Sequence, residues 1–224
     1  MGLATTPRQL NDGTTIPPIG FGTAGLRGDD DAIASTRESL ERLGLEQIDV
    51  HVIHWPNPSR DKYHEAWRDL VQLRDDGLVR SPGVSNFTGE HLGRIIDETG
   101  VTPVLNQIEL HPYFPQPQMR QVDAERGILT ESWSPMGKRQ APFAEPVVRA
   151  AAEAHGVSPG QVVLRWQLQL GNLPIPKSAT PARQRENLDL DGFELTDEEV
   201  AAITALARPD GRLFGGDPDT HEEM

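Results

Sequence analysis

Short apolar runs alternate with amphipathic stretches along most of this chain. Residues 48–55 and 79–87 are runs with the length and composition of buried strands. Between them, Tyr63, Trp67 and Leu70 recur at the spacing of one helix face. The pattern therefore predicts strands that alternate with helices.

Six strands are predicted in the repeating pattern, at 19–23, 48–55, 79–87, 104–110, 128–133 and 173–176. Helices are predicted at 35–43, 63–71, 92–96, 116–126, 147–155 and 158–170, with a last one from 196. Ser158 and Thr196 are each expected to begin a capping box, in which a side chain bonds the backbone three positions on. The alternation favours a parallel sheet with helical crossovers.

Two segments fall outside this repeat. Residues 9–18 predict a small N-terminal hairpin with Asp12-Gly13 at its turn. Residues 208–224 are rich in Gly, Pro and Asp, and we expect a loop or frayed coil there. No low-complexity linker divides the chain, so residues 1–224 are interpreted as one domain.

Composition narrows the classes of partner. The 21 basic and 34 acidic side chains give a formal charge of −13, which would repel nucleic acid and anionic membranes. The chain has no cysteine, and therefore no disulfide or thiolate site. It shows neither a signal-peptide core nor an apolar run of roughly 20 residues that would span a membrane. We therefore expect a cytoplasmic protein.

Several short motifs occur in a fixed order and together resemble the aldo-keto reductases. They are Gly20-Phe21-Gly22-Thr23, Ile53-His54-Trp55-Pro56, Gly83-Val84-Ser85-Asn86-Phe87, Asn106-Gln107-Ile108-Glu109, Trp133-Ser134-Pro135 and Ile175-Pro176-Lys177-Ser178. Each motif alone is weak, whereas all of them in the family's order are specific. The resemblance covers nearly the whole chain. It implies a TIM-type (β/α) barrel that binds NADP(H) and reduces small carbonyl compounds.

The resemblance also implies which residues surround the nicotinamide and the carbonyl group. Ser85, Asn86 and Gln107 match the residues that hydrogen-bond the carboxamide, and their side chains are suitable donors and acceptors. Trp133 matches the aromatic residue that stacks on the nicotinamide. His54 matches the catalytic histidine at the end of the fourth strand.

The other end of the cofactor has matching residues as well. Lys177 and Arg183 match the positions that grip the 2′-phosphate, and an ammonium and a guanidinium suit that dianion. The remaining implied cofactor contacts are Gly22, Thr23, Ser134 and Ser178, with Glu186 and Asn187 at the adenine.

Each of these residues has a plainer interpretation when the resemblance is set aside. The serine–asparagine pair would be a turn or a cap, and Trp133 a core side chain. The lysine and the arginine would lie on a solvated surface, and His54 would be a core histidine with its hydrogen bonds made. His91 and His155 have no ligand partner at useful spacing, so we expect them on the surface and predict no metal site.

The catalytic group of the family is incomplete in this chain. The family protonates the carbonyl oxygen with a tyrosine, whose pKa a lysine and an aspartate adjust, and the histidine assists. The segment 24–34 joins Thr23 to the next matched helix and contains no tyrosine, no lysine and no Asp-Thr-Ala motif. Of the tyrosines, Tyr63 belongs to a helix stripe and Tyr113 is weighed as a replacement acid. Only His54 remains of the four residues.

We interpret the gap as an internal deletion of about 50 residues between Thr23 and Ser35, the size of two β/α units. The expected fold is then an incomplete barrel of about six units, with open strand edges that invite self-association. The expected function is NADPH-dependent reduction of aldehydes or ketones, with activity weak or lost. The alternatives are a catalytically dead NADP-binding barrel and a non-functional product of the deletion.

Overall fold

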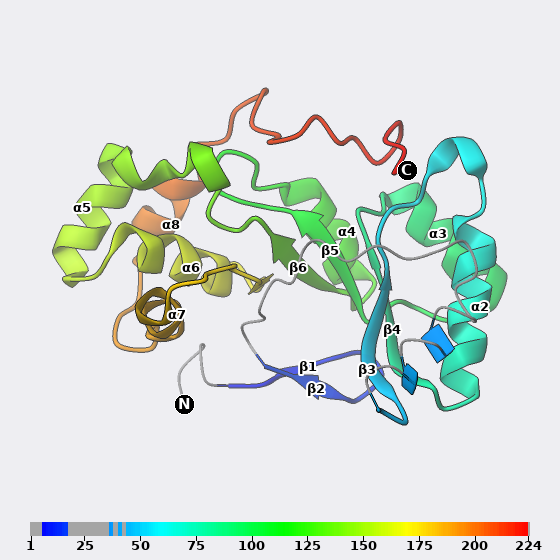
Figure 1. Ribbon diagram of the computed structural model, residues 1–224. Coiled ribbons are helices and arrows are strands. Elements are labelled where there is room, and N and C mark those ends of the chain that lie inside the picture. Colours follow the sequence, from blue (N-terminus) through cyan, green and yellow to red (C-terminus); the bar gives the residue numbers. More distant parts are fainter. Residues whose placement is uncertain (1–5, 18–35, 38–39, 42–43, 224) are drawn as a thin grey trace.

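The computed structural model describes residues 6–17, 36–37, 40–41 and 44–223. Within them, a parallel sheet has the strand order β3-β4-β5-β6-β7 (Figure 1). Its strands are β3 (Ile48–Ile53), β4 (Val79–Ser85), β5 (Leu105–Glu109), β6 (Leu129–Trp133) and β7 (Leu173–Pro174). Spatial order follows sequence order and each connection contains a helix, which is the arrangement of a TIM-type α/β fold.

The helices lie close to the predicted positions, except α7, for which no bounds were predicted. They are α2 (Tyr63–Asp75), α3 (Gly89–Thr99), α4 (Pro117–Glu125), α5 (Pro146–His155), α6 (Pro159–Gln169), α7 (Pro181–Leu188) and α8 (Asp197–Thr204). Short 3-10 turns are η1 (Pro58–Arg60), η2 (Lys138–Gln140) and η3 (Pro142–Ala144). The capping boxes predicted at Ser158 and Thr196 are confirmed, and they open α6 and α8.

A third capping box opens α3 and corrects one prediction. Thr88 precedes this helix, and its backbone N–H donates to Nδ1 of His91 at 3.2 Å. His91 is therefore buried, and its expected surface position is wrong. His155 is only partly exposed, and its Nε2 lies 2.9 Å from a carboxylate oxygen of Glu199.

Five of the six predicted strands lie within the described residues. All five are present, and the sixth, at 19–23, lies outside the described residues, as does the junction 24–34. Thr36, Arg37, Leu40 and Glu41 are helical, in agreement with the helix predicted at 35–43. Among the described residues, β3 and β7 each pair on one side only, so they form the two edges of the sheet.

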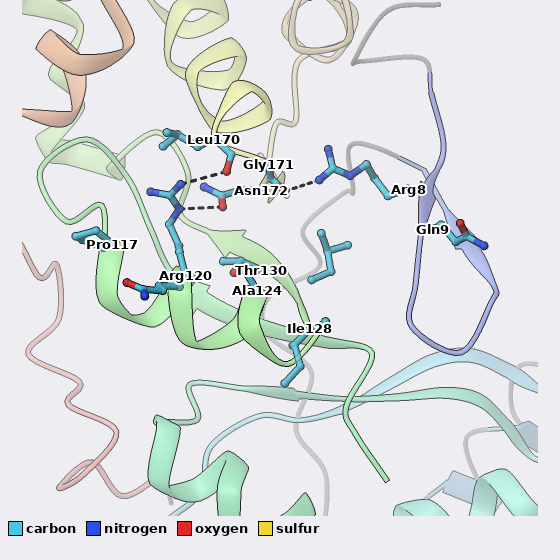
Figure 2. Close-up of a pocket in the computed structure, with 13 residues that line it drawn as sticks. Arg8, Gln9, Pro117, Arg120, Ala124, Ile128, Thr130, Leu170, Gly171 and Asn172 are labelled. Carbon is cyan, nitrogen blue, oxygen red and sulfur yellow. Dashed lines mark hydrogen bonds between the residues drawn. The ribbon is translucent and has the colours of Figure 1, made fainter. Parts of the chain in front are cut away.

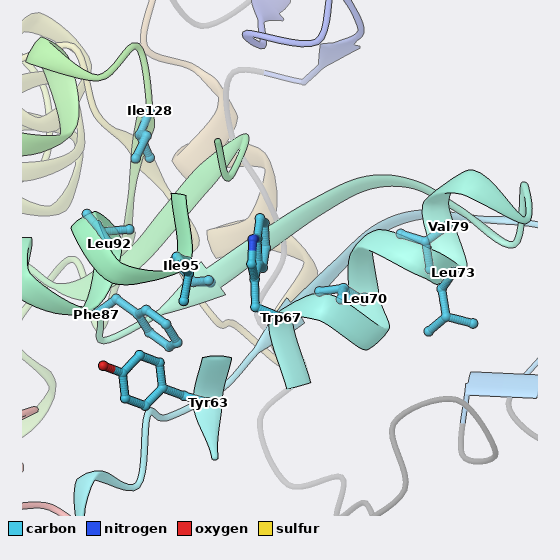
Figure 3. Close-up of a cluster of buried hydrophobic side chains, with 10 residues drawn as sticks. Tyr63, Trp67, Leu70, Leu73, Val79, Phe87, Leu92, Ile95 and Ile128 are labelled. Atoms are coloured by element: carbon cyan, nitrogen blue, oxygen red, sulfur yellow. The ribbon is translucent and has the colours of Figure 1, made fainter. Parts of the chain in front are cut away.

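Two large clusters of buried side chains pack helices against the sheet. One cluster joins α2 and α3 to β4, and Trp67 is fully buried at its centre (Figure 3). The rings of Tyr63 and Phe87 meet edge to face, with centroids 5.6 Å apart. A second cluster packs α5, α6 and α8 around Val162 and Trp166. The helical stripe predicted from Tyr63 onward therefore buries the face that the sequence indicated.

The N-terminal hairpin forms as expected, with strands β1 (Arg8–Gln9) and β2 (Thr15–Ile16). Oδ1 of Asp12 accepts from the backbone N–H of Thr14 at 2.9 Å, which closes the turn. Oδ2 of Asp12 accepts from Oγ of Ser81 at 2.6 Å, so the turn rests on β4. No helix in the described part of the chain is long and apolar enough to cross a membrane.

Candidate functional site

The candidate site lies along the edge where the parallel strands end. The register pairs Ile53 of β3 with Val84 of β4, and Ser85 of β4 with Gln107 of β5. Most residues predicted from the sequence therefore share this carboxyl edge, either on a strand or just after one. They are His54, Ser85, Asn86, Gln107, Trp133, Ser134, Lys177 and Ser178. Gly22 and Thr23 lie outside the described residues.

Asn86 connects the ends of three strands. Its Nδ2 donates to the carbonyl oxygen of His54 and to Oγ of Ser85, each at 3.0 Å. Its Oδ1 accepts from Nε1 of Trp133 at 2.8 Å. The residue is buried and has a φ of 60°, a left-handed conformation that asparagine adopts more readily than most residues. Asn86 therefore fixes where the histidine, the serine and the tryptophan stand relative to one another.

Gln107 lies beside a carboxylate that the sequence did not bring forward. Its backbone carbonyl accepts from Oγ of Ser85 at 2.8 Å, and its Nε2 donates to Oε2 of Glu131. Burial raises the pKa of Glu131, while the bond from Gln107 acts in the opposite direction. An acidic residue inside a predicted strand was the available signal, because strands of this kind are mostly apolar.

His54 follows β3 and has a largely exposed side chain. Its Nδ1 lies 2.9 Å from Oε2 of Glu223, and in the described part of the chain no group bonds Nε2. The next ring, that of Trp55, lies against His221 with centroids 4.2 Å apart. His54 therefore holds a carboxylate with Nδ1, and Nε2 has no bond within the described residues.

Glu223 belongs to a segment, 208–223, that crosses the carboxyl edge and that we call the tail (Figure 1). The backbone N–H of Arg208 donates to the carbonyl oxygen of Tyr113 at 3.0 Å, and that of Leu213 donates to Oε1 of Glu109 at 2.6 Å. The Phe214 ring stacks on the Trp133 ring with centroids 6.1 Å apart and an interplanar angle of 27°. The tail is a loop, as predicted, but the sequence did not indicate that it covers the site.

Glu109 and His111 form a buried pair under the tail. Nε2 of His111 lies 3.0 Å from Oε1 of Glu109, and both side chains are almost fully buried. The other polar atoms of the two side chains, Oε2 and Nδ1, have no hydrogen-bond partner among the described residues. Since the bonded oxygen also accepts from Leu213, this pair is an anchor for the tail.

The residues predicted to grip a phosphate lie after β7 and on α7. The backbone N–H of Ile175 donates to the carbonyl oxygen of Ser132 at 3.1 Å, so this segment leaves the sheet beside β6. Lys177 and Arg183 are exposed, and neither forms an ion pair within the described residues. Oγ of Ser178 accepts from the backbone N–H of Thr180 at 3.2 Å. Glu186 and Asn187 follow on α7 and are partly exposed.

Neither tyrosine resembles the family's proton donor. Oη of Tyr113 donates to Oε1 of Glu145 at 2.6 Å, and the guanidinium of Arg208 lies 3.6 Å from the ring centroid. Burial and the neighbouring Glu145 raise the pKa of Tyr113, so its proton is held more tightly than usual. Tyr63 is part of the buried cluster shown in Figure 3. No group of three or more His, Asp or Glu side chains within the described part of the chain could hold a metal ion.

Comparison with known proteins agrees with this arrangement. A sequence profile of the aldo/keto reductase family matches residues 26–208. The 2,5-diketo-D-gluconic acid reductase B of Corynebacterium sp. (strain SHS752001) is 57% identical over 194 residues, which cover 87% of this chain and 69% of that protein. Methylglyoxal reductase DkgA of Escherichia coli (strain K12) is 46% identical over 183 residues, which cover 81% of this chain and 66% of that protein.

Solved structures are similar over most of the chain. The apo form of Gox0644 matches with a TM-score of 0.92 at 36% identity, covering 98% of this chain and 100% of that one. A point mutant of Gox0644 in complex with NADPH gives the same TM-score and coverage. An aldo-keto reductase of Bombyx mori in complex with NADP has a TM-score of 0.82 at 28% identity and covers 91% of this chain and 93% of that one.

Proposed function

Because the chain belongs to the aldo/keto reductase family, we propose that it binds NADP(H) along the carboxyl edge of its sheet. The observation that carries the proposal is the network around Asn86, which joins Ser85 and Trp133 in one rigid group at that edge. A preorganised group of polar side chains beside an aromatic ring fits the carboxamide and the ring of a nicotinamide.

The preference for NADP(H) over NAD(H) rests on the cations after β7. Lys177 and Arg183 are exposed and lack ion pairs within the described residues, although the chain as a whole carries a formal charge of −13. A lysine supplies a point charge and an arginine a planar fork, and both bind phosphate dianions well. The donors at this end therefore fit a 2′-phosphate, with Glu186 and Asn187 proposed at the adenine.

Carbonyl reduction is the reaction class that we propose for this site. NADPH, when bound, supplies the hydride that reaches the carbonyl carbon, and the carbonyl oxygen must then receive a proton. His54 is proposed to orient that oxygen and to hand over the proton from Nε2, while Nδ1 stays on Glu223. General acid catalysis is worth roughly 10²–10⁴-fold, so a single histidine in place of four residues makes turnover weak or absent.

The substrate of this site is proposed to be a small carbonyl compound. Similar proteins are named as reductases of 2,5-diketo-D-gluconic acid and of methylglyoxal, which are small dicarbonyl compounds. Small dicarbonyl compounds should therefore be among the first substrates assayed. The internal deletion between Thr23 and Ser35 and the cytoplasmic location also stay predictions.

A fluorescence titration tests cofactor binding. Binding of NADPH should quench tryptophan emission and should be at least tenfold tighter than binding of NADH. The double variant Lys177→Gln/Arg183→Gln should lose that difference, because only NADPH carries the 2′-phosphate. The matched control is Lys62→Gln/Arg149→Gln, which removes the same charge from exposed sites elsewhere. Absence of quenching up to millimolar NADPH would contradict the proposal and favour a product without function.

Steady-state oxidation of NADPH tests turnover separately. A reactive panel of aldehydes and dicarbonyls should give a slow rate that His54→Ala abolishes. Tight binding of NADPH with no oxidation would identify a non-catalytic NADP-binding barrel. An oxidation rate that His54→Ala leaves unchanged would belong to a contaminant and would remove the proposed role of the histidine.

A further inference from the structure

A cavity lies away from the carboxyl edge, between α4, the start of β6 and the loop that joins α6 to β7. Its volume is about 580 Å³, and strand β1 of the hairpin borders it (Figure 2). Such a volume is within the range of small-molecule sites. The residues that line it include Arg8, Gln9, Arg120, Gln121 and Thr130. Because β6 begins here, the cavity opens toward the amino end of the sheet.

Two arginine side chains meet at one wall of this cavity. Nη2 of Arg120 donates to the carbonyl oxygen of Leu170 at 3.1 Å, and its Nε donates to Oδ1 of Asn172 at 3.3 Å. A guanidinium nitrogen of Arg8 donates to the carbonyl oxygen of Gly171. Figure 2 shows both side chains directed at this short loop from different sides. The positive charges of Arg8 and Arg120 are thus held close together, because both side chains bond the loop 170–172.

Neutral carbonyl oxygens satisfy some of the donors but do not neutralise the two charges. Both arginines are half-buried, and this burial lowers the pKa of each guanidinium group. Each guanidinium has five N–H donors. The bonds to the loop use one donor of Arg8 and two of Arg120. Donors therefore remain for a ligand at a half-buried site.

The dipole at the end of α6 offsets only a part of the charge on the two guanidinium groups. The two arginines lie at the carboxyl end of α6, and a helix end of this kind has the effect of about half a negative charge. Two guanidinium groups exceed this by about 1.5 positive charges. None of the described lining residues is acidic. The nearby Asp123 bonds Thr130, and burial raises its pKa to about 7, so near neutral pH it is about half ionised and leaves an excess of about one positive charge.

We propose that this cavity binds the phosphate group of a small phosphomonoester. A phosphomonoester carries about −1.5 to −2 charges near neutral pH, opposite in sign to the excess at the two guanidinium groups. Arginine forks bind phosphate oxygens in pairs. The cavity is larger than a phosphate ion, and Gln9 lines it with an amide group. Gln121 and Thr130 donate to Glu125 and Asp123, so they offer acceptor oxygens to the organic part. The site is distinct from the proposed cofactor site, which lies at the opposite end of the strands.

Calorimetric titration with glycerol 3-phosphate tests the proposal, with inorganic phosphate and glycerol as companion probes. The titrations use the Lys177→Gln/Arg183→Gln protein, so that binding at the proposed cofactor site does not contribute. Glycerol 3-phosphate should bind, inorganic phosphate should bind more weakly, and glycerol should give no heat. Arg8→Gln and Arg120→Gln should each weaken binding at least tenfold, whereas Arg149→Gln, an exposed charge on α5, should leave it unchanged.

The variants also separate binding from folding. Arg8 holds the hairpin and Arg120 holds the α6–β7 loop, so circular dichroism must show that each variant is folded. Where a glutamine variant fails to fold, Arg8→Lys or Arg120→Lys keeps the charge and should retain binding that is weaker but measurable. The proposal would be overturned if the folded Arg8→Gln and Arg120→Gln variants gave the same heats as the Lys177→Gln/Arg183→Gln protein. It would also be overturned if neither glycerol 3-phosphate nor inorganic phosphate gave any heat.

Discussion

Asp123 is fully buried in α4, where a carboxylate is costly. It accepts from Oγ1 of Thr130 at 2.8 Å and from Nδ2 of Asn106 at 3.2 Å. These bonds do not outweigh burial, which raises the pKa of Asp123 to about 7. Since its unfolded pKa is about 3.9, the folded state binds more protons between these values. The free energy of unfolding should therefore fall as the pH rises from about 4 to 7, by up to about 4 kcal/mol.

Asp123→Asn should remove most of this pH dependence, because an amide does not ionise. Urea denaturation at pH 5 and pH 8 measures the difference in the free energy of unfolding for each protein. Asp97→Asn, at an exposed position on α3, is the control and should keep the parent difference. An unchanged difference in Asp123→Asn would show that another group causes the slope.

The bond between Trp133 and Asn86 can be tested by a small change. Trp133→Phe keeps an aromatic ring but removes the N–H that donates to the buried Oδ1 of Asn86. We expect a loss of about 1–3 kcal/mol in the free energy of unfolding, which is typical of a buried acceptor left without its donor. Trp55→Phe, which removes an indole from a ring contact at the same edge, should cost less. Equal losses would argue against the bond.

At the scale of elements, one hydroxyl group adds a polar link to the apolar contact between α2 and α3. Nε1 of Trp67 donates to Oγ1 of Thr99 at 3.0 Å, and that hydroxyl donates to the carbonyl oxygen of Ile95 at 2.7 Å. Thr99→Val should lower the free energy of unfolding by about 1–3 kcal/mol, because the indole N–H loses its acceptor. Thr99→Ser keeps the hydroxyl and should cost clearly less in the same denaturation experiment.

The tail is the element with the most direct effect on the proposed cofactor site. Phe214 stacks on Trp133, the ring on which a nicotinamide is proposed to stack. An aromatic pair contributes about 0.5–1.5 kcal/mol, so Phe214→Ala should tighten NADPH binding roughly 2- to 10-fold. Phe143→Ala, at an exposed position in η3, should have no effect on the same titration. Weaker binding in Phe214→Ala would mean that the ring supports the cofactor instead of competing with it.

The elements show which part of the structure was predictable. Strands such as β4 and helices such as α2 were found because local periodicity records which side faces the core. The tail lacks periodicity, and its contact with His54 joins residues 169 positions apart. The motifs likewise indicated that Asn86 belongs to the site. They could not indicate that its side chain bonds Trp133, because that bond depends on how three strands align.

At the scale of the whole molecule, two opposing forces act on self-association. The strands β3 and β7 are edges among the described residues, and unpaired backbone groups at such edges favour pairing with another chain. The formal charge of −13 opposes close approach of two copies. Salt screens that repulsion, with a Debye length of about 30 Å at 0.01 M and about 3 Å at 1 M.

The apparent mass from light scattering should therefore rise with protein concentration, and rise more steeply at high salt than at low salt. The low-salt measurement on the same sample is the internal control. A constant monomer mass under both conditions would show that the edges are protected. A larger mass at low salt would point to ion pairs between copies as the cause of association.

The crossing of the tail over the carboxyl edge has a consequence for the timing of synthesis. Glu223 leaves the ribosome 169 residues after His54, which takes roughly 10–30 s at common rates of translation. Throughout that interval the histidine lacks its carboxylate, and Trp133, once made, lacks the ring of Phe214 for a further 81 residues. The helices and strands up to β7 can form earlier in synthesis, whereas the candidate site is completed only once Phe214 and Glu223 have been made.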